Sequence, residues 1–577
     1  MYIFVAVDLN RNFTNVDQVF QHTNNLIDTG FTQKIEMVIQ DDLAILFESR
    51  SEFGCLEKQN DRILSLISGY RDSGNQGDEG EYSRIKIFKD RVVAYSDFSG
   101  SCPIFYGVNN GIAAISNDVF SIAIFLGFHS ISLNSAIELV KYSHCIGRET
   151  TIDGVYRVWP EEELHLEISA NAITTSNITS TKLDYVYNSP NLKDDAIDVA
   201  FEKLLRNTER NFKNTTKSLC QLSGGLDSRL TVAILSQIEG REINTFHMIL
   251  SDDYEAEIAS QIADKLNTKH HSVALDCADL EMAKKAWILT AGQVGVDAAA
   301  GNLVGYKYAL ENGFNQIIGG WQGDCLIGSY VPSESLFVSN RLKKLAIKSW
   351  VLNRGYSDDE ICSVFQRISK KSLRKLRKKL RKEIEKKDFK TAAQQVSWWG
   401  MFRRQPTFSN ISPARLCSNL VERTPLLAPE YIKELLKLQG SDLINKNFYR
   451  KMIWNKCSKL RKVKYANTGK ELVGDYDLTL KSLNLRRLIY TLFPMSLVLN
   501  LYKKYLNRRN NIAYLDEKHL NESSHWRVIF EKEVQIADSN SVWGISAENI
   551  KSENSAVHFL GVFLALEWSR KYLAGFK

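Results

Sequence analysis

Five residues that suit phosphate chemistry are concentrated in one short stretch: Ser223, Gly224, Gly225, Asp227 and Ser228. Adjacent glycines let the backbone approach a ligand closely, and the N–H groups at the start of a helix face an anion. Serine hydroxyls add donors, and the aspartate can hold a Mg²⁺ ion that neutralises phosphate charge. The stretch predicts a pyrophosphate-binding loop. It is not the P-loop of other nucleotide-binding proteins, because no lysine follows the second glycine.

The surrounding pattern predicts the elements that position this loop. Residues 217–222 form a short apolar run typical of a buried strand, and the apolar residues after 225 recur at helical spacing. A second strand is expected at 243–250, followed by a helix through 266 and a third strand at 270–275. Alternating strands and helices predict a parallel sheet covered on both faces.

A further glycine-rich segment, 317–330, ends another predicted strand and reads Ile-Ile-Gly-Gly-Trp-Gln-Gly-Asp-Cys-Leu-Ile-Gly-Ser-Tyr. The loop at 223–228 resembles that of the N-type ATP pyrophosphatases, and 317–330 resembles the G-x-G-[GS]-D-E loop of the asparagine synthase superfamily. That superfamily includes asparagine synthetases, β-lactam synthetases and lasso-peptide cyclases. The segments occur in the order and at the separations typical of it.

The resemblance implies ATP and Mg²⁺ as cofactors. By that match, Leu222 and Met248 contact adenine through backbone groups, and Gly319 and Gly320 belong to the pyrophosphate site. Asp324 is the second metal ligand beside the aspartate of the first loop.

The chain also departs from the family pattern at three positions. Trp321 stands where the family usually has an acid, Cys325 where it has glutamate, and Ala428 where the R-x-P-[FL]-L-D segment ends in aspartate. Because the first acid is implicated in the acyl chemistry of asparagine synthetases, the acceptor here need not be aspartate.

The family's catalytic lysine precedes a glycine by about six residues. Here Lys464 precedes Gly469 by five residues and Lys462 by seven, and Lys470 follows that glycine directly. Lys464 is the predicted catalytic lysine, with the other two left as alternatives.

Residues 1–165 alternate short strands with turns and predict a β-rich layered domain. The segment 95–118 resembles a hairpin of the glutaminase domain of asparagine synthetases, which implies a degenerate Ntn-type domain. Residues 166–193, rich in Ser, Thr and Asn, suit a linker or an edge hairpin. The remainder, 194–577, is expected to be the α/β ATP-pyrophosphatase domain with helical elaborations.

Glutamine hydrolysis is not expected. The glutaminase domain uses an N-terminal cysteine whose own α-amino group is the base, with a pKa of about 7.7–8.0. Here Tyr2 follows Met1, the first cysteine is Cys55, and 40–80 contains no counterpart of the N-G-E segment that binds glutamine.

Residues 331–400 are expected to be a basic helical insertion. The stretch 370–387 holds eleven basic and two acidic residues, with four apolar residues in a narrow stripe. It predicts either a solvated helix lying on the domain or a surface for an anionic membrane or polyanionic substrate. A second basic-apolar stretch at 486–504 adds to the surface hypothesis.

Composition sets outer bounds on function. The 577 residues are 44% hydrophobic and 24% charged, and the net charge of +7 is too mild to imply nucleic acid. Nine scattered cysteines without metal spacing indicate free thiols in a reducing, cytoplasmic compartment, with membrane association left open. Neither a signal peptide nor a membrane span is expected.

The resemblance thus predicts a carbon–nitrogen ligase that adenylates a carboxylate, forms AMP and pyrophosphate, and transfers the acyl group to an amine. Its substrates are expected to be small-molecule, sugar or peptide carboxylates and amines. The alternatives are an ammonia-dependent asparagine synthetase, a transferase of an adenylyl group, and an inactive scaffold or binding homologue.

Overall fold

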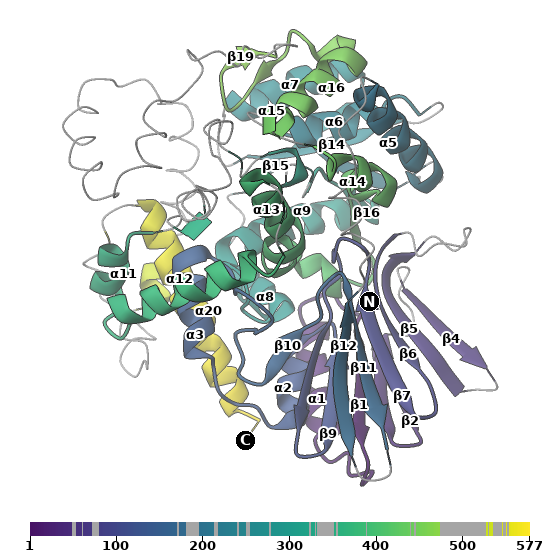
Figure 1. The fold of residues 1–577 in the computed structure, drawn as a ribbon, viewed down its shortest axis with the longest axis vertical. Coiled ribbons are helices and arrows are strands. Elements are labelled where there is room, and N and C mark those ends of the chain that lie inside the picture. The colour runs from purple at the N-terminus through teal and green to yellow at the C-terminus, as the bar shows by residue number, and fades with distance from the viewer. Residues whose placement is uncertain are drawn as a thin grey trace.

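A computed structural model gives the fold of the chain (Figure 1). The residues that it describes are 1–48, 54–59, 62–71, 80–169, 172–179, 195–212, 217–238, 242–249, 254–275, 279–321, 323, 325–328, 331, 351–352, 356–387, 389, 391–438, 440–443, 446–472, 527–528, 530–534, 545, 550 and 553–576.

The N-terminal part contains two antiparallel sheets. The first has the order β10-β8-β9-β1-β3-β2 and the second β12-β11-β7-β6-β5-β4. The strands of the first are β1 (Ile3–Asp8), β2 (Ile35–Gln40), β3 (Leu43–Glu48), β8 (Phe105–Asn109), β9 (Ile112–Ser116) and β10 (Val155–Arg157). Those of the second are β4 (Gly54–Gln59), β5 (Arg62–Arg71), β6 (Gly80–Ile87), β7 (Arg91–Ser96), β11 (Glu162–Ile168) and β12 (Ile173–Thr179).

The burial of β1 explains the layering. Its side chains alternate between the two faces of the sheet, and all six are buried. Ile3 and Val5 belong to the core between the sheets, whereas Phe4 and Ala6 belong to a separate core that includes helices α1 (Val16–Ile27) and α2 (Val119–Leu126). The predicted β-rich layered domain is therefore confirmed.

The segment predicted as a linker or an edge hairpin is an edge hairpin through Thr179. β11 pairs with β7 on one side and with β12 on the other, so β12 forms the edge of the second sheet. The rest of the predicted linker, 180–193, lies outside the described residues.

The C-terminal part is built on a five-stranded sheet of order β15-β14-β13-β16-β17, and every neighbouring pair is parallel. Its strands are β13 (Ser218–Gln221), β14 (Asn244–Ile249), β15 (Lys269–Ala274), β16 (Gln316–Ile318) and β17 (Val421–Arg423). The helices along it are α5 (Ala196–Phe212), α6 (Leu226–Leu235), α7 (Tyr254–Leu266), α8 (Leu280–Thr290) and α9 (Val296–Glu311). The predicted parallel α/β architecture is confirmed.

Helix α20 (Glu553–Ala574), near the end of the chain, joins the two parts (Figure 1). The Tyr572 hydroxyl lies 2.7 Å from Nδ1 of His22 on α1, and Trp287 on α8 donates its indole N–H to the Ser569 hydroxyl at 3.0 Å. No helix among the described residues is long and apolar enough to cross a bilayer.

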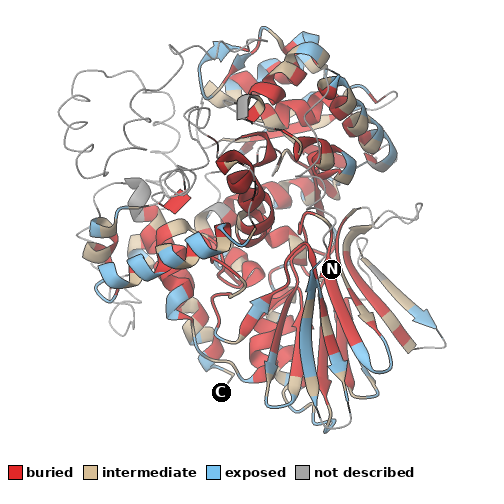
Figure 2. Cartoon of the chain, viewed as in Figure 1, coloured by how far each residue is buried: buried red, intermediate tan, exposed pale blue. Residues whose placement is uncertain are grey.

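The basic insertion folds into α11 (Asp358–Val364), α12 (Lys370–Ile384) and α13 (Ala392–Trp399). The apolar stripe of α12 is buried within the protein, and most of its basic residues are exposed (Figure 2). Lys379 pairs with the buried carboxylate of Glu138, on α3 (Leu133–Tyr142), at 2.5 Å. The apolar stripe is therefore not available to a membrane, and a membrane contact of α12 would have to use its exposed basic residues. The stretch 486–504 lies outside the described residues.

Other elements complete the C-terminal part. They are α14 (Pro429–Leu435), α15 (Gly440–Leu443), α16 (Asn447–Lys456), β18 (Lys464–Tyr465), β19 (Lys470–Glu471), the π-helical turn Gly400–Arg404 and the 3-10 turns Cys325–Ile327, Gln405–Thr407, Pro413–Leu416, Pro425–Leu427 and Ser458–Leu460.

Candidate active site

The predicted pyrophosphate loop connects β13 to α6 at the carboxyl end of the central strand. Gly225 caps the helix, and its N–H donates to the Ser223 hydroxyl at 3.2 Å. The hydroxyls of Ser223 and Ser228 are 3.0 Å apart, and the Ser223 N–H donates to that of Ser228 at 3.1 Å. The serines thus hold the loop in shape at a helix N-terminus, where the backbone favours an anion.

A second segment closes over this loop. The N–H of Ala466, in the turn between β18 and β19, donates to the carbonyl of Gly224 at 3.2 Å. A Cβ on Gly224 would lie only 2.7 Å from the Cβ of Ala466, so this approach requires glycine.

Arg229, on α6, holds the loop and this second segment together by hydrogen bonds. Its guanidinium donates to the carbonyls of Lys464 at 2.5 Å and Val463 at 3.1 Å, with a longer contact of 3.4 Å to the Gly224 carbonyl. Burial lowers the pKa of Arg229 to about 10, so the side chain is still charged at neutral pH. Sequence reasoning assigned this arginine no role.

The hydrogen bonds of Arg229 fix the backbone of Lys464 in particular. Its side chain is exposed, and its Nζ lies 5.9 Å from the ring centre of Tyr254 on α7. Lys462 and Lys470 are exposed as well, but Arg229 bonds the backbone of neither. Of the three predicted lysines, Lys464 is the one whose backbone is fastened to the helix of the pyrophosphate loop.

The segment after β16 meets the first loop at Asp227. A Cβ on Gly320 would lie 2.6 Å from the carbonyl carbon of Asp227, and one on Gly323 would lie 3.1 Å from its Oδ1. The Gly319 N–H donates to the Arg423 carbonyl on β17 at 2.9 Å. Two signatures distant in sequence therefore share one surface. Asp324, the other predicted metal ligand, lies outside the described residues.

Lys446, which sequence reasoning missed, also reaches this point. Its Nζ is 3.8 Å from Oδ2 of Asp227. It lies just before α16 in a left-handed conformation, with φ of 58°, and no motif marks it. A cation beside the carboxylate suits a site in which phosphate and metal charges meet.

The arrangement around Asp227 fits one end of a Mg²⁺ site. Mg²⁺ bound to nucleotide phosphates keeps several waters and takes one or two protein carboxylates. The loop comes this close to Asp227 because residues 320 and 323 are glycines, since a Cβ at Gly320 would clash with the backbone of Asp227. Among the described residues no cluster of three His, Cys, Asp or Glu side chains could hold a metal ion by itself. Metal binding here would therefore depend on the nucleotide.

Of the two predicted adenine contacts, Leu222 directly follows β13 and Met248 lies on the neighbouring strand β14. The Leu222 N–H donates to the Phe246 carbonyl at 2.8 Å, and its carbonyl lies 3.0 Å from Nδ1 of His247. A carbonyl has two lone pairs, so an adenine contact through Leu222 is compatible with that bond. Met248 is half-buried beside Gly305 of α9, where a Cβ would lie 3.2 Å from its sulfur.

A cavity of about 180 Å³ lies between the N-terminal sheets and the C-terminal part. We call it the interdomain cavity; its lining includes Glu81, Trp321, Arg415, Glu422 and Thr424. The Thr424 N–H donates to Oε1 of Glu81 at 2.8 Å across the two parts. No sequence pattern pointed to this cavity.

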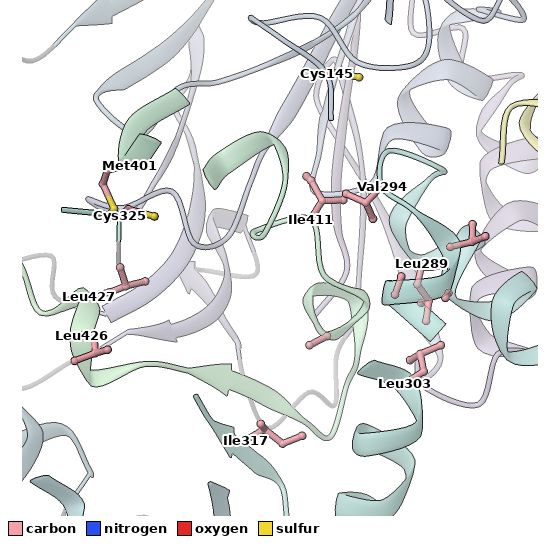
Figure 3. Packing of buried hydrophobic residues seen from close by; sticks show 14 of the residues in the cluster. Cys145, Leu289, Val294, Leu303, Ile317, Cys325, Met401, Ile411, Leu426 and Leu427 are labelled. Atoms are coloured by element: carbon pink, nitrogen blue, oxygen red, sulfur yellow. The ribbon is translucent and has the colours of Figure 1, made fainter. Parts of the chain in front are cut away.

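The family departures fall in different surroundings. Trp321 lines the interdomain cavity. Cys325 is fully buried, accepts a hydrogen bond from the Gln405 amide, and lies beside Met401 in the core (Figure 3). Ala428 is buried and is the N-cap residue of α14. Of these three departures from the family pattern, Trp321 is therefore the one that lines a cavity.

The structure is that of an α/β domain in which a glycine-rich loop and a helix N-terminus follow the central strand of a parallel sheet. Residues 201–460 match the asparagine synthase family. The chain therefore carries an asparagine synthase domain, as the resemblance predicted, and members of that family are ATP-dependent ligases.

Solved structures add little to this assignment. The chain is similar to a glutamine phosphoribosylpyrophosphate amidotransferase from B. subtilis complexed with ADP and GMP, with 8% identity and a TM-score of 0.19 over 48% of this chain and 91% of that one. It is also similar to a structure described as the allosteric regulatory enzyme of purine biosynthesis, with 9% identity and a TM-score of 0.20 over 47% and 89%. TM-scores this low support no conclusion. No curated protein matches the chain.

Proposed function

We propose that this chain is an AMP-forming carbon–nitrogen ligase that adenylates a carboxylate with ATP and transfers the acyl group to an amine without hydrolysing glutamine. The observation that carries the proposal is the convergence of three segments on Asp227 and Gly224. The glycine loop after β16, the hairpin β18–β19 and Lys446 all surround the loop at the start of α6.

Each group has a role in stabilising the charge of departing pyrophosphate. Backbone N–H groups at the start of α6 favour the anion, and Lys464 and Lys446 supply positive charge from two sides. Asp227 and Asp324 would hold Mg²⁺, which supplies Lewis-acid stabilisation of the phosphate oxygens when bound. Arg229 keeps Lys464 in register with the loop.

The absence of glutamine hydrolysis is supported by the thiols near the Met1 amine. Two thiols, those of Cys102 and Cys417, are among the groups whose charge acts on the Met1 amine, and both are buried. Burial raises the pKa of Cys102 to about 11 and raises the pKa of Cys417 further. Neither is an activated thiolate at neutral pH, and a nucleophilic thiol must be one.

ATP-dependent pyrophosphate release tests the proposal. The purified chain is incubated with MgATP and a panel of amino-acid, uronic-acid and peptide carboxylates, with and without ammonium chloride. Asp227→Asn is expected to abolish pyrophosphate release and to weaken MgATP binding in calorimetry, while the circular dichroism spectrum is retained. Asp264→Asn, an exposed aspartate on α7, is the matched control and keeps both.

The outcomes separate the alternatives. Release with aspartate and ammonia alone would favour an ammonia-dependent asparagine synthetase. Stoichiometric glutamate formation from glutamine would contradict the second half of the proposal. An unchanged MgATP affinity in Asp227→Asn would contradict the site. MgATP binding without pyrophosphate release on any carboxylate would favour an inactive homologue, for which the buried Cys325 in place of glutamate is the motivating observation.

A further inference from the structure

The interdomain cavity adjoins the pyrophosphate site through one short loop. Gly320 packs on Asp227, and the next residue, Trp321, lines the cavity. Thr424 and Leu427, which follow β17, form part of the same wall. The loop that carries Gly320 and Trp321 therefore borders both the cavity and the proposed ATP site.

The charged side chains that line the cavity are two acids and one base. Glu422 lies on β17, with Oε2 3.8 Å from the Arg415 guanidinium, and accepts a hydrogen bond from Tyr306 through its other oxygen. Glu81 comes from β6 of the N-terminal part and is 7% exposed. The lining carries an excess negative charge only while Glu81 is ionised, and in that state it favours a cation.

Other charged groups act on Glu81 from outside the lining. The Arg423 guanidinium lies 3.5 Å from the ring centre of Tyr70 and 4.1 Å from that of Phe212, and the charge of Asp97 acts on Glu81 from the N-terminal part. Burial raises the pKa of Glu81 to about 7, against the opposing effects of Arg423, the Thr424 N–H and Arg415. The carboxylate is thus poised to gain or lose its proton near neutrality.

Two further features point to a ligand in this space. Trp321 and Phe408 both line the cavity, and aromatic rings attract ammonium ions through their π-faces. The Thr424 side chain is 5% exposed, and among the described residues its hydroxyl has no hydrogen-bond partner. A buried hydroxyl without a partner costs free energy unless a ligand or water satisfies it.

We infer that the interdomain cavity binds the amine substrate as its ammonium ion, held by Glu81 and by the ring of Trp321. The inference rests on the proposed function, to which it adds the substrate class and the place where the amine enters. The N-terminal sheets then contribute a residue to the synthase site, which gives the degenerate glutaminase-like part a role in substrate binding.

Thermal unfolding with three probes of similar shape tests this assignment in the full chain. The probes are n-butylammonium chloride, sodium butyrate and n-butanol, at equal ionic strength and pH 8. A ligand that binds only the folded state raises the melting temperature in proportion to its saturation. The wild type is expected to be stabilised saturably by butylammonium alone. Stabilisation by butyrate instead, or by none of the probes, would overturn the inference.

Variants locate the effect. Glu81→Gln, a near-isosteric change, is expected to weaken butylammonium binding at least about tenfold, and Trp321→Leu about threefold or more. Glu163→Gln, an exposed glutamate on β11, is the control and leaves the affinity unchanged. Equal affinities in Glu81→Gln and the wild type would place the cation elsewhere and contradict the inference.

The pH dependence supplies a test that needs only folded wild-type protein. Since the pKa of Glu81 is about 7, the affinity for butylammonium is expected to fall about tenfold between pH 8 and pH 6 as this carboxylate is protonated. A flat profile would contradict the role of Glu81. Stabilisation by MgATP is measured in parallel: if MgATP fails and butylammonium succeeds, the proposed ligase function fails and the cation site remains.

Discussion

Arg229→Met tests whether the hairpin β18–β19 is held by one buried side chain. Methionine has similar length and suits a buried site, but it cannot donate to the carbonyls of Lys464 and Val463. Those bonds are 2.5 and 3.1 Å long and join α6 to the hairpin β18–β19. The substitution therefore removes the fastening and leaves both elements otherwise intact.

The magnitude follows from the two shorter bonds. A hydrogen bond to a charged group contributes about 1.5–3 kcal/mol, so the hairpin loses about 3–6 kcal/mol of attachment. Removing a buried charge relieves a desolvation cost, so the free energy of unfolding of the whole chain falls by less than this. The effect is expected to be local.

Hydrogen exchange measures that local effect. The amide of Ala466 is bonded to the Gly224 carbonyl, and its protection reports closure of the hairpin over the loop. A loss of 3 kcal/mol or more predicts exchange that is faster by about 100-fold or more, since each 1.4 kcal/mol is a factor of ten. Pyrophosphate release should fall in parallel.

The control is Arg374→Met on the exposed face of α12, which should leave exchange at Ala466 unchanged. Unaltered protection of Ala466 in Arg229→Met would refute the reasoning, because the hairpin would then be held by other contacts. A general rise in exchange throughout the parallel sheet would show instead that Arg229 supports the whole fold.

Three further outcomes are expected. The folded pKa of Glu81, about 7, lies above its usual 4.5, so the folded state retains a proton that the unfolded state loses; from pH 4.5 to 7 the wild type should lose about 3 kcal/mol of stability relative to Glu81→Gln. Urea unfolding at pH 5 and 8 measures this, and parallel pH profiles would contradict it. Lys379→Met should lower the free energy of unfolding by about 2–3 kcal/mol, because the buried Glu138 loses its ion-pair partner and keeps only the Ile146 N–H. The exposed Lys378→Met should change it by less than about 0.5 kcal/mol, and equal effects of the two substitutions would show that the ion pair does not hold α12 in place. The exposed basic face of α12 should give co-sedimentation with anionic vesicles at low salt that is lost at high salt, and equal recovery with neutral vesicles would count against a membrane contact.

The sequence by itself determined the elements whose signals are local. Adjacent glycines between an apolar run and a helical pattern predict the strand, loop and helix around Asp227, and the structure has β13, the loop and α6 there. Alternating strands and helices predicted the parallel sheet. The stripe of leucines predicted α12, which occupies Lys370–Ile384, and whether protein or membrane would cover that stripe was left open. Such patterns are readable because the period of side-chain directions is set by the backbone of each element.

Only the tertiary structure decided which residues share the site. Arg229 meets Val463 and Lys464, Lys446 meets Asp227, and Glu81 meets Thr424, each from a different part of the chain. None of these pairs produces a local pattern in the sequence. A contact between distant parts of the chain constrains the shape and charge of two residues, but it does not constrain the spacing of residues within one segment. The interdomain cavity arises in the same way: its charges come from separate elements, and their balance exists only once the sheets and the synthase domain are packed together.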